Sequence, residues 1–404
     1  MLHLRAAVFV ALIVGVAAQA GLLYARAVEA RAVYTLAPDL FSTKHLGVAL
    51  QREAFRRPDL LPVYGSSEFE AYPGPYTASA FFAGAPTGFG VFAVGSGGMT
   101  PLLILERLAA VGADVQGKKV VILASPTFVR GDDRIRQTYY AGNFSPLHGY
   151  DLAFGSSISR DLQRDVARRM LEYPTTLDKE PLLRFALQRL VDDTPMDRLL
   201  YDAIWPLGRL RILMLSVQDH WLTASMVANV DGERPAPTSL PMRKPGTPDW
   251  EAIRQDAEAL ARDRSGSNAW GFADEYWQEH GADLTRQRGR QTDTAFLRSI
   301  KQDADWTDFE LLLRGLRELG AEPLVLSVPM KGAYYEYWGV SERARDAYYR
   351  QVRLLSERYG VPVRTFANAD GDLLFNGDER SHPSQLGWVA YDQVIDAFYQ
   401  GRLR

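Results

Sequence analysis

Residues 60–69 read LLPVYGSSEF, a short apolar run that ends in a small glycine–serine turn. A continuous apolar run of this length, bounded by a turn, is typical of a buried β-strand. A serine just beyond such a strand lies at the sheet edge where open α/β folds place their ligands. Ser67 is therefore the first candidate for a nucleophile, while a turn that simply ends the strand is the structural alternative.

On both sides of a long interruption, apolar runs alternate with stretches of helical periodicity. Apolar runs at 89–94 and 119–124 flank a helical stretch at 100–113. Near the C-terminus the pattern predicts helices at 308–319, 341–359 and 385–399 and strands at 323–328 and 361–366. Strands that alternate with helices indicate a parallel sheet covered on both faces. The predicted fold class is α/β, with a parallel sheet flanked by helices.

The alternation is lost between about 130 and 300. This part contains helical stretches at 158–172 and 206–230, followed by a proline-rich stretch at 233–241 that is typical of a surface loop. We interpret it as a mostly helical insertion that packs over the sheet edge. Residues 59–404 are then one domain in space.

A long apolar segment lies near the N-terminus. Residues 6–25 read AAVFVALIVGVAAQAGLLYA, 20 residues with Gln19 as the clearly polar side chain. A helix of that length rises about 30 Å, the thickness of the hydrocarbon core of a bilayer. The segment predicts a transmembrane anchor, followed at 26–58 by a juxtamembrane stalk. A cleaved signal peptide is the alternative, because Ala18-Gln19-Ala20 has the pattern of a cleavage site.

Charge and composition exclude several classes of function. The 404 residues carry a formal net charge of −3 with acidic and basic residues mixed throughout, and nucleic-acid binding would need a basic patch. The chain has no cysteine. Thiol catalysis, disulfides and cysteine metal sites are therefore excluded.

A nucleophilic serine needs a general base, and histidine is the usual one because its ordinary pKa is near neutrality. The chain has six histidines: His3, His45, His148, His220, His280 and His382. Of these, His382 alone follows the last predicted strand, in a loop that should open on the same sheet edge as Ser67. A carboxylate must orient the imidazole. Glu379 and Asp378, three and four residues earlier, are both candidates.

Two further stretches are candidates for binding. Gly95-Ser96-Gly97-Gly98 follows the second apolar run and could offer backbone N–H groups to an oxyanion. The lysine-containing phosphate loop and the dinucleotide fingerprint are both missing, so no cofactor is expected. Lys331, with Tyr334 and Tyr337, follows a late strand and is a candidate for binding an anionic acceptor. A solvated lysine beside core tyrosines is the alternative.

An ordered set of motifs resembles the DltD family, and Ser67 falls where the related GDSL-type (SGNH) hydrolases keep their nucleophile. The motifs are Gly65-Ser66-Ser67-Glu68, Gly95-Ser96-Gly97-Gly98, Ser125-Pro126, Asn143-Phe144-Ser145-Pro146-Leu147, DFELL at 308–312, PMKG at 329–332, Tyr335-x-Tyr337-x-Gly339 and His382 with Gly387-Trp388. They run in order from about residue 60 to the C-terminus.

This resemblance implies an SGNH-like domain outside the cytoplasmic membrane, anchored by a single N-terminal span with residues 1–5 on the cytoplasmic side. It implies D-alanyl transfer in the D-alanylation of teichoic acid or a similar envelope glycopolymer, without a metal or cofactor. The implied partners are a D-alanyl donor, either a carrier protein or an acylated membrane acyltransferase, and the glycopolymer acceptor.

Carried over by position, Ser67 is the nucleophile, His382 the base and Glu379 the orienting acid. The family normally has Asp at that third place, so Asp378 is the alternative acid. The implied oxyanion donors are Ser67, Gly97, Gly98 and Thr127. Thr127 lies in SPTFV at 125–129, where the family usually has Ser-Pro-Gln-Trp-Phe.

Two other functions stay open at this point. An envelope polysaccharide O-acetyltransferase or esterase would use the same three side chains on a different acyl group. A non-catalytic adaptor for an acyl-carrier protein or a membrane acyltransferase would not need the serine at all.

Overall fold

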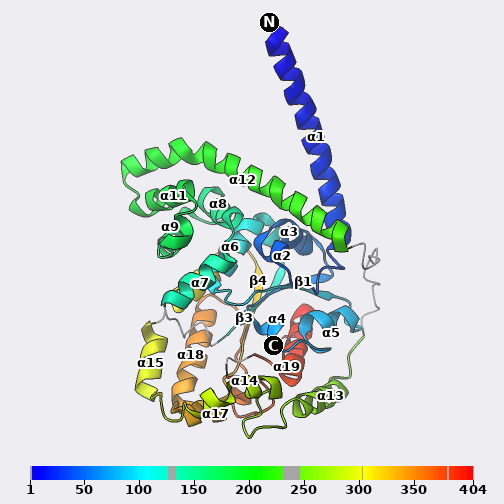
Figure 1. The fold of residues 1–404 in the computed structure, drawn as a ribbon, viewed down its shortest axis with the longest axis vertical. Coiled ribbons are helices and arrows are strands. Elements are labelled where there is room, and N and C mark those ends of the chain that lie inside the picture. Colours follow the sequence, from blue (N-terminus) through cyan, green and yellow to red (C-terminus); the bar gives the residue numbers. More distant parts are fainter. Residues whose placement is uncertain (1, 126–132, 231–245, 303, 380–381, 404) are drawn as a thin grey trace.

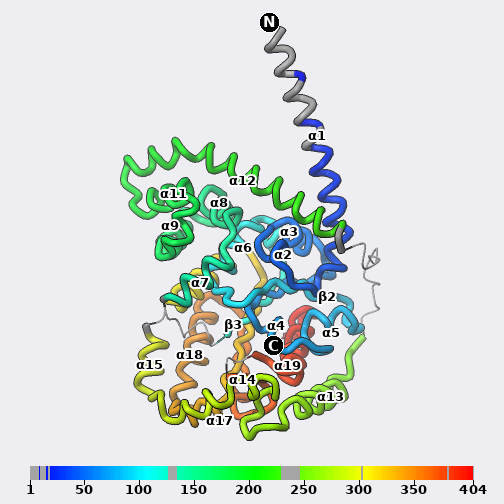
Figure 2. Tube along the Cα trace, in the orientation of Figure 1, coloured from blue at the N-terminus to red at the C-terminus, as the bar shows by residue number. Residues whose placement is uncertain are grey.

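The computed structural model describes residues 2–125, 133–230, 246–302, 304–379 and 382–403, which are traced in Figure 1 and Figure 2. A five-stranded sheet in the order β2-β1-β3-β4-β5 forms its centre, and each neighbouring pair of strands is parallel. The strands are β1 Leu60–Tyr64, β2 Gly90–Val94, β3 Lys119–Ala124, β4 Glu322–Ser327 and β5 Val363–Arg364. The predicted α/β fold with a parallel sheet is confirmed.

Helices cover both faces of the sheet and form the insertion between β3 and β4 (Figure 1). Before the insertion they are α1 Leu2–Ala32, α2 Ser42–Leu46, α3 Ala49–Arg56, α4 Glu68–Ala71, α5 Ala78–Gly84 and α6 Pro101–Val111. Those between β3 and β4 are α7 Asp133–Asn143, α8 Pro146–Phe154, α9 Arg160–Met170, α10 Pro174–Leu177, α11 Pro181–Asp192, α12 Pro195–Val230, α13 Trp250–Asp263, α14 Asp274–Thr285, α15 Asp293–Gln302 and α16 Asp305–Glu318. After β4 come α17 Gly332–Trp338, α18 Glu342–Arg358 and α19 Gln385–Tyr399.

The central strand β1 is buried along its whole length and pairs with β2 from Leu60↔Gly90 to Tyr64↔Val94. Its alternate side chains enter two different cores. Leu60 and Tyr64 belong to the core that includes α6 and α16, whereas Leu61 and Val63 belong to the core that includes α5 and α19. A strand buried on both faces needs an apolar residue at every position. The continuous run in the sequence is explained by this burial.

The turn after β1 occupies a special place in the sheet. The chain passes from β1 outward to β2, and then returns to place β3 on the other side of β1. Such a reversal of strand order leaves a crevice beyond the carboxyl end of the strand, where open α/β sheets bind their ligands. The residues that follow Tyr64 are therefore at the position where the fold most readily builds a site.

The long helix α12 differs from its prediction. The sequence predicts a start at Pro206, but the helix begins at Pro195 and contains Pro206 in its interior. Proline removes one backbone donor within a helix. The packing of α12 against α1, α8 and α11 compensates for this loss.

The N-terminal segment corrects one expectation. Residues 26–58 are not a stalk, because α1 continues to Ala32 and the chain after it packs into the core. Val33, Leu36, Leu50 and Phe55 are all buried, and α3 lies against β1. Burial of these residues in the core could not be predicted from a segment of mixed charge.

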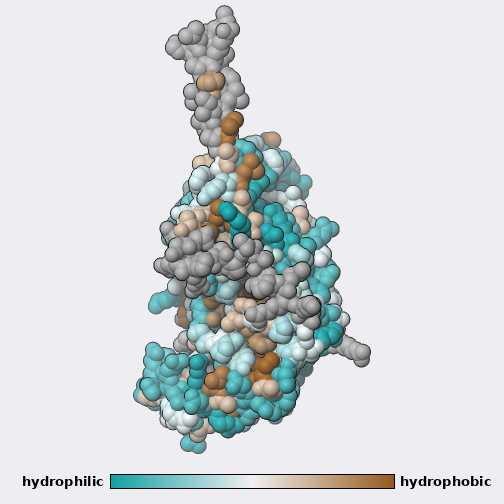
Figure 3. All heavy atoms as spheres, turned by 90° about the vertical axis from the view of Figure 1, so that its right-hand side faces the viewer, coloured by the Kyte–Doolittle hydropathy of each residue, from teal (hydrophilic) through white to brown (hydrophobic). Residues whose placement is uncertain are grey.

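The first part of α1 projects away from the body, and Figure 3 shows apolar atoms gathered around the base of this projection. Phe9, Val16, Leu23 and Tyr24 are exposed along it. Within the residues open to description, no helix combines the length and apolar character needed to cross a bilayer.

Candidate active site

Ser67 lies directly after β1, where a tight turn joins the strand to α4. Gly65 is required in this turn, because a Cβ there would lie 2.9 Å from the Phe69 ring and 3.0 Å from Leu123. The Ser67 side chain is partly exposed, while its neighbours Ser66 and Glu68 are buried. The turn therefore presents Ser67 Oγ at the sheet edge.

The structure brings His382 to this serine from the other end of the chain. Nε2 of His382 is 2.8 Å from Ser67 Oγ. His382 is held by a short hairpin, in which Asn376 pairs with Pro383 and Gly377 N–H donates to the His382 carbonyl at 2.9 Å. The predicted pairing of these two residues agrees with the geometry.

Asp378 is the carboxylate that holds the imidazole. Its Oδ2 lies 2.5 Å from Nδ1 of His382, and its Oδ1 accepts the His382 backbone N–H at 3.1 Å. The Tyr72 hydroxyl also donates to Oδ2, at 3.1 Å. Burial opposes ionisation of Asp378, but the His382 imidazole and these hydrogen bonds outweigh it and hold the pKa of the carboxyl below its ordinary value.

This arrangement decides the tautomer of the imidazole. An ionised carboxylate can only accept, so Nδ1 of His382 must carry the hydrogen that Asp378 accepts. Nε2 then presents its lone pair to the Ser67 hydroxyl and can take its proton. The three side chains form the hydrogen-bonded series needed to activate a serine.

The resemblance assigned Glu379 by position as the orienting acid, with Asp378 as the alternative, and the alternative is the residue that contacts the imidazole. Glu379 accepts a hydrogen bond from the Tyr276 hydroxyl, whereas Nδ1 of His382 is bonded to Asp378. The hairpin places the residue four positions before the histidine, not three, beside the ring. The family normally has an aspartate as this acid, so residue type predicts the contacting acid better than the spacing to the histidine does.

Ser66 and the glycine loop at 95–98 support each other. Ser66 Oγ donates to the Ser96 carbonyl at 3.3 Å and accepts from Met99 N–H at 3.1 Å. Gly98 has φ +80°, and a Cβ there would lie 2.4 Å from the Tyr139 ring, so only glycine fits. These contacts place the loop that contains Gly97 and Gly98 next to the serine turn. Thr127 lies outside the described residues.

Asn143, at the end of α7, fixes the orientation of this loop. Its Nδ2 donates to the Gly97 carbonyl at 3.0 Å and to the Tyr139 carbonyl at 3.1 Å. In a trans peptide the carbonyl and the following N–H point in opposite directions. The bond to the Gly97 carbonyl therefore turns the Gly98 N–H away from Asn143. Asn143 begins the motif at 143–147, but that motif by itself predicts no role for its side chain.

Glu68 is a buried carboxyl directly beneath the serine turn. Its Oε2 accepts the Ser66 backbone N–H at 2.6 Å, and the residue is 1% exposed. Burial raises the pKa of Glu68 although His382 lies close enough to oppose the rise. Glu68 therefore stabilises the backbone of the turn that carries Ser67.

The structure contradicts the expectation that Lys331 binds an anionic acceptor, because the side chain is buried. Lys331 is 1% exposed, and its Nζ donates to the carbonyls of Gly271, Leu373 and Asn376 at 2.9, 2.6 and 2.6 Å. Burial lowers its pKa to about 7. An ammonium has three donors, and all three are used here. Lys331 instead ties the hairpin that carries His382 to the segment before α14.

The two tyrosines of the same group have different surroundings. Tyr337 donates to the Thr285 carbonyl at 2.6 Å on the surface, and the Tyr334 hydroxyl lies 3.5 Å from the Leu284 carbonyl. Tyr334 lines a hollow of about 280 Å³ together with Tyr276 and Glu379. This hollow adjoins the His382 hairpin through Glu379.

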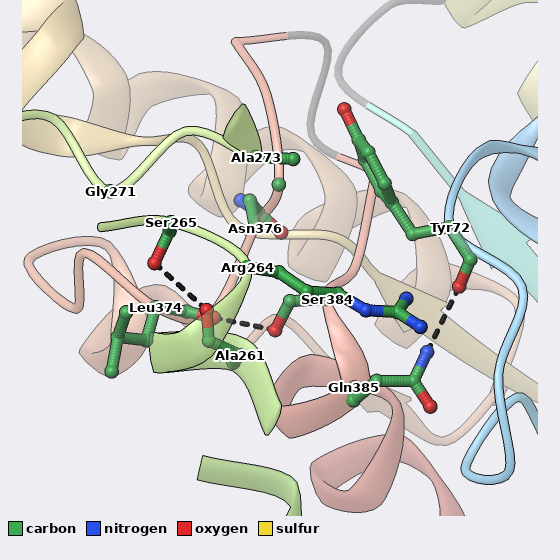
Figure 4. A pocket seen from close by; sticks show the side chains of 11 residues that line it. Tyr72, Ala261, Arg264, Ser265, Gly271, Ala273, Leu374, Asn376, Ser384 and Gln385 are labelled. Carbon is green, nitrogen blue, oxygen red and sulfur yellow. Dashed lines mark hydrogen bonds between the residues drawn. The ribbon is translucent and has the colours of Figure 1, made fainter. Parts of the chain in front are cut away.

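Gln385 and Ser384 follow the His382 hairpin and bond it to the backbone of Tyr72 and Leu374 (Figure 4). Gln385 Nε2 donates to the Tyr72 carbonyl at 2.9 Å, and Ser384 Oγ donates to the Leu374 carbonyl at 2.5 Å. Figure 4 shows the Tyr72 ring directed away from Gln385, and the Tyr72 hydroxyl donates to Asp378.

Among the described residues, no group of three or more His, Asp or Glu side chains could hold a metal ion.

Comparison with known proteins gives a consistent result. The family model described as DltD protein matches residues 37–400. The chain is 27% identical over 367 residues to Protein DltD of Bacillus subtilis (strain 168). The aligned part covers 90% of this chain and 88% of that protein. It is 22% identical over 356 residues to Protein DltD of Staphylococcus aureus (strain NCTC 8325 / PS 47), covering 88% and 85% respectively.

Proposed function

The chain belongs to the DltD family, and from this membership and the geometry of Ser67, His382 and Asp378 we propose that it transfers D-alanyl groups by serine chemistry. The substrate class is a D-alanyl ester or thioester, and the acceptor is a hydroxyl of teichoic acid or a similar envelope glycopolymer. The proposed fold relationship is to the SGNH hydrolases.

The first half-reaction acylates the serine. Ser67 Oγ attacks the carbonyl carbon of the D-alanyl donor while Nε2 of His382 takes the hydroxyl proton. The resulting imidazolium is stabilised by Asp378, which keeps its negative charge. When the bond to the donor breaks, the imidazolium returns the proton to the leaving oxygen or sulfur.

The second half-reaction releases the acyl group to the acceptor. An acceptor hydroxyl loses its proton to Nε2, attacks the acyl-serine, and the same proton returns to Ser67 Oγ. In both halves negative charge develops on the carbonyl oxygen, which needs N–H donors already in place. The backbone N–H groups of Ser67, Gly97 and Gly98 are the proposed donors, since the serine turn and the glycine loop are joined through Ser66.

The proposed location is the outer face of the cytoplasmic membrane, with residues 6–25 as a single anchoring span. Support comes from the 20-residue apolar run and from the projection of α1 away from the body. The donor is then a carrier protein or an acylated membrane acyltransferase.

The observation that carries the proposal is the hydrogen-bonded series from Ser67 through His382 to Asp378 in a chain of this family. The test replaces Ser67 by Ala and measures acylation of the purified protein by a D-alanyl thioester, together with D-alanyl esters in the envelope. Both should fall by about 10³-fold or more, because a nucleophile has no substitute. Ser225→Ala, on the exposed side of α12, is the matched control and should behave as wild type.

The remaining alternatives have different outcomes in the same experiment. An acetyl group found on Ser67 by mass spectrometry would favour the O-acetyltransferase or esterase. If cells with folded Ser67→Ala protein keep normal levels of D-alanyl esters, the serine is not catalytic and the adaptor function is supported instead.

A further inference from the structure

The outer face of α12 is apolar along most of the helix. Leu199, Leu207, Leu210, Leu213, Met214 and Trp221 are each 50–63% exposed, and we call these six residues the α12 apolar face. At about 100° per residue they all point within about 60° of Leu210. The other positions in that sector between 196 and 221 are Met196, Ala203, Pro206 and Val217, so the stripe contains no polar side chain.

The inner face of the same helix is fixed to the body. Tyr201, Ile212 and Val227 are buried, and Gly208 packs so closely on Phe154 that a Cβ would lie 2.4 Å from its ring. Asp219 accepts the backbone N–H groups of Val48 and Ala49 at 2.8 Å and so anchors α12 to the start of α3. The helix therefore cannot rotate to bury its outer side. Part of that outer side must meet another apolar phase or remain in water.

The N-terminal helix indicates which apolar phase is available. Near the C-terminal end of α12, His220 Nδ1 lies 2.7 Å from Glu29 Oε1, and the Trp221 ring packs on Gly21. Beyond this contact α1 leaves the body from the side on which α12 lies (Figure 1). Leu23 and Tyr24, two and three residues after Gly21, are exposed there, so α1 carries exposed apolar side chains next to its contact with α12.

The borders of the stripe fit a lipid surface. Arg209 points just outside one border of the stripe and is exposed, and its guanidinium lies 5.6 Å from the ring of Trp205, which is exposed further round the helix. An arginine beside an apolar stripe, with a tryptophan close to it, is typical of helices that lie at the boundary between headgroups and acyl chains. A protein partner would not require exposed apolar side chains on the anchoring helix next to its contact with α12.

We propose that the α12 apolar face lies in the headgroup–acyl boundary of the bilayer and holds the body flat against the membrane. The inference rests on the anchoring proposed for residues 6–25. It goes beyond that anchoring, because a single span alone would leave the body free to swing about α1. With α12 on the membrane, the orientation of the Ser67 edge relative to lipid-linked substrates is fixed.

The absence of cysteine makes a direct test possible. A nitroxide is attached to Leu210→Cys in the full-length chain, reconstituted into vesicles of phosphatidylglycerol and phosphatidylcholine. Its accessibility to oxygen, which partitions into lipid, is compared with its accessibility to a water-soluble nickel chelate. Val16→Cys reports on the anchor. Ala252→Cys, exposed on α13 at the opposite end of the body, is the matched control.

We expect the labels at 16 and 210 to be more accessible to oxygen and the label at 252 to the nickel chelate. A label at 16 in lipid with one at 210 in water would overturn the inference and leave the anchor intact. Labels at both positions in water would remove the anchor and the inference together. If the label at 210 is shielded from both reagents, with spin–spin broadening that disappears on dilution with unlabelled chain, a second copy covers the face and the inference is wrong.

Discussion

Burial and hydrogen bonding have opposite effects on the pKa of Asp378. Its side chain is buried, yet it accepts hydrogen bonds from the imidazole, a backbone N–H and a tyrosine hydroxyl. Together these donors keep it ionised. In the proposed mechanism, the charge of Asp378 stabilises the imidazolium that forms when His382 takes the serine proton.

Replacing Asp378 by Asn should reduce acylation of Ser67 by about 10⁴-fold, because an amide no longer enforces the required tautomer. Glu379→Gln removes one carboxylate from the adjacent position and should keep acylation within about 10-fold of wild type, since Glu379 bonds Tyr276. Acylation rates of both proteins are measured with the D-alanyl thioester. The reverse ranking of the two variants would restore Glu379 as the acid.

The same residue predicts how stability depends on pH. The pKa of Asp378 is lower in the folded protein than its ordinary value near 3.8. A depressed carboxyl pKa contributes stability above the unfolded pKa and loses it as the pH falls through the folded pKa. The difference in Tm between wild type and Asp378→Asn should therefore be largest near pH 7 and shrink below about pH 4. Melting curves at both pH values would show this, and a constant difference would contradict it.

At the scale of elements, α7 and the glycine loop form one unit through Asn143. Asn143→Ala removes the donor that holds the Gly97 carbonyl, so the Gly98 N–H loses its fixed direction. We expect acylation to slow by about 10- to 100-fold through kcat, with little change in KM, because oriented donors act on the transition state. Asn368→Ala, an exposed asparagine in the turn Ala367–Ala369, is the matched control. A change in KM alone would assign Asn143 to substrate binding instead.

The His382 hairpin depends in a similar way on Lys331. Lys331→Met fills the same space but leaves the carbonyls of Gly271, Leu373 and Asn376 without their donor. Each buried group that loses its partner costs about 1–3 kcal/mol. The variant should therefore melt several degrees lower and lose acylation in parallel. An unchanged Tm with a raised KM for the acceptor would instead support the acceptor-binding role expected from the sequence.

Some of these elements were predictable because their signal is local. The strands at 60–64 and 119–124 are continuous apolar runs, and this is what burial on both faces of a parallel sheet requires. Ser67 and His382 followed from the rule that parallel strands end at one edge. The choice between Asp378 and Glu379 depended on the path of a hairpin, which neighbouring residues do not determine.

At the scale of the whole molecule, the failures share one cause. Lys331 resembles a surface lysine in sequence, but three carbonyls from distant segments surround it. The charged segment after residue 26 resembles a stalk, but its apolar residues pack beneath the sheet. Long-range contacts of this kind have no counterpart in periodicity or composition. The exposed apolar side of α12 likewise can be identified only once its inner face is known to pack on the body.

The separation of Ser67 and His382 by 315 positions has a consequence for how the protein is made. The Ser67 turn is synthesised early, but His382 arrives only with the last loop, and α19 must then pack in the same core as β1 to hold that loop in place. A chain that is still being synthesised, or one cut short before His382, therefore contains Ser67 without His382. In the proposed mechanism, reactivity toward acyl donors therefore begins only after the last loop has been made and has folded against the sheet.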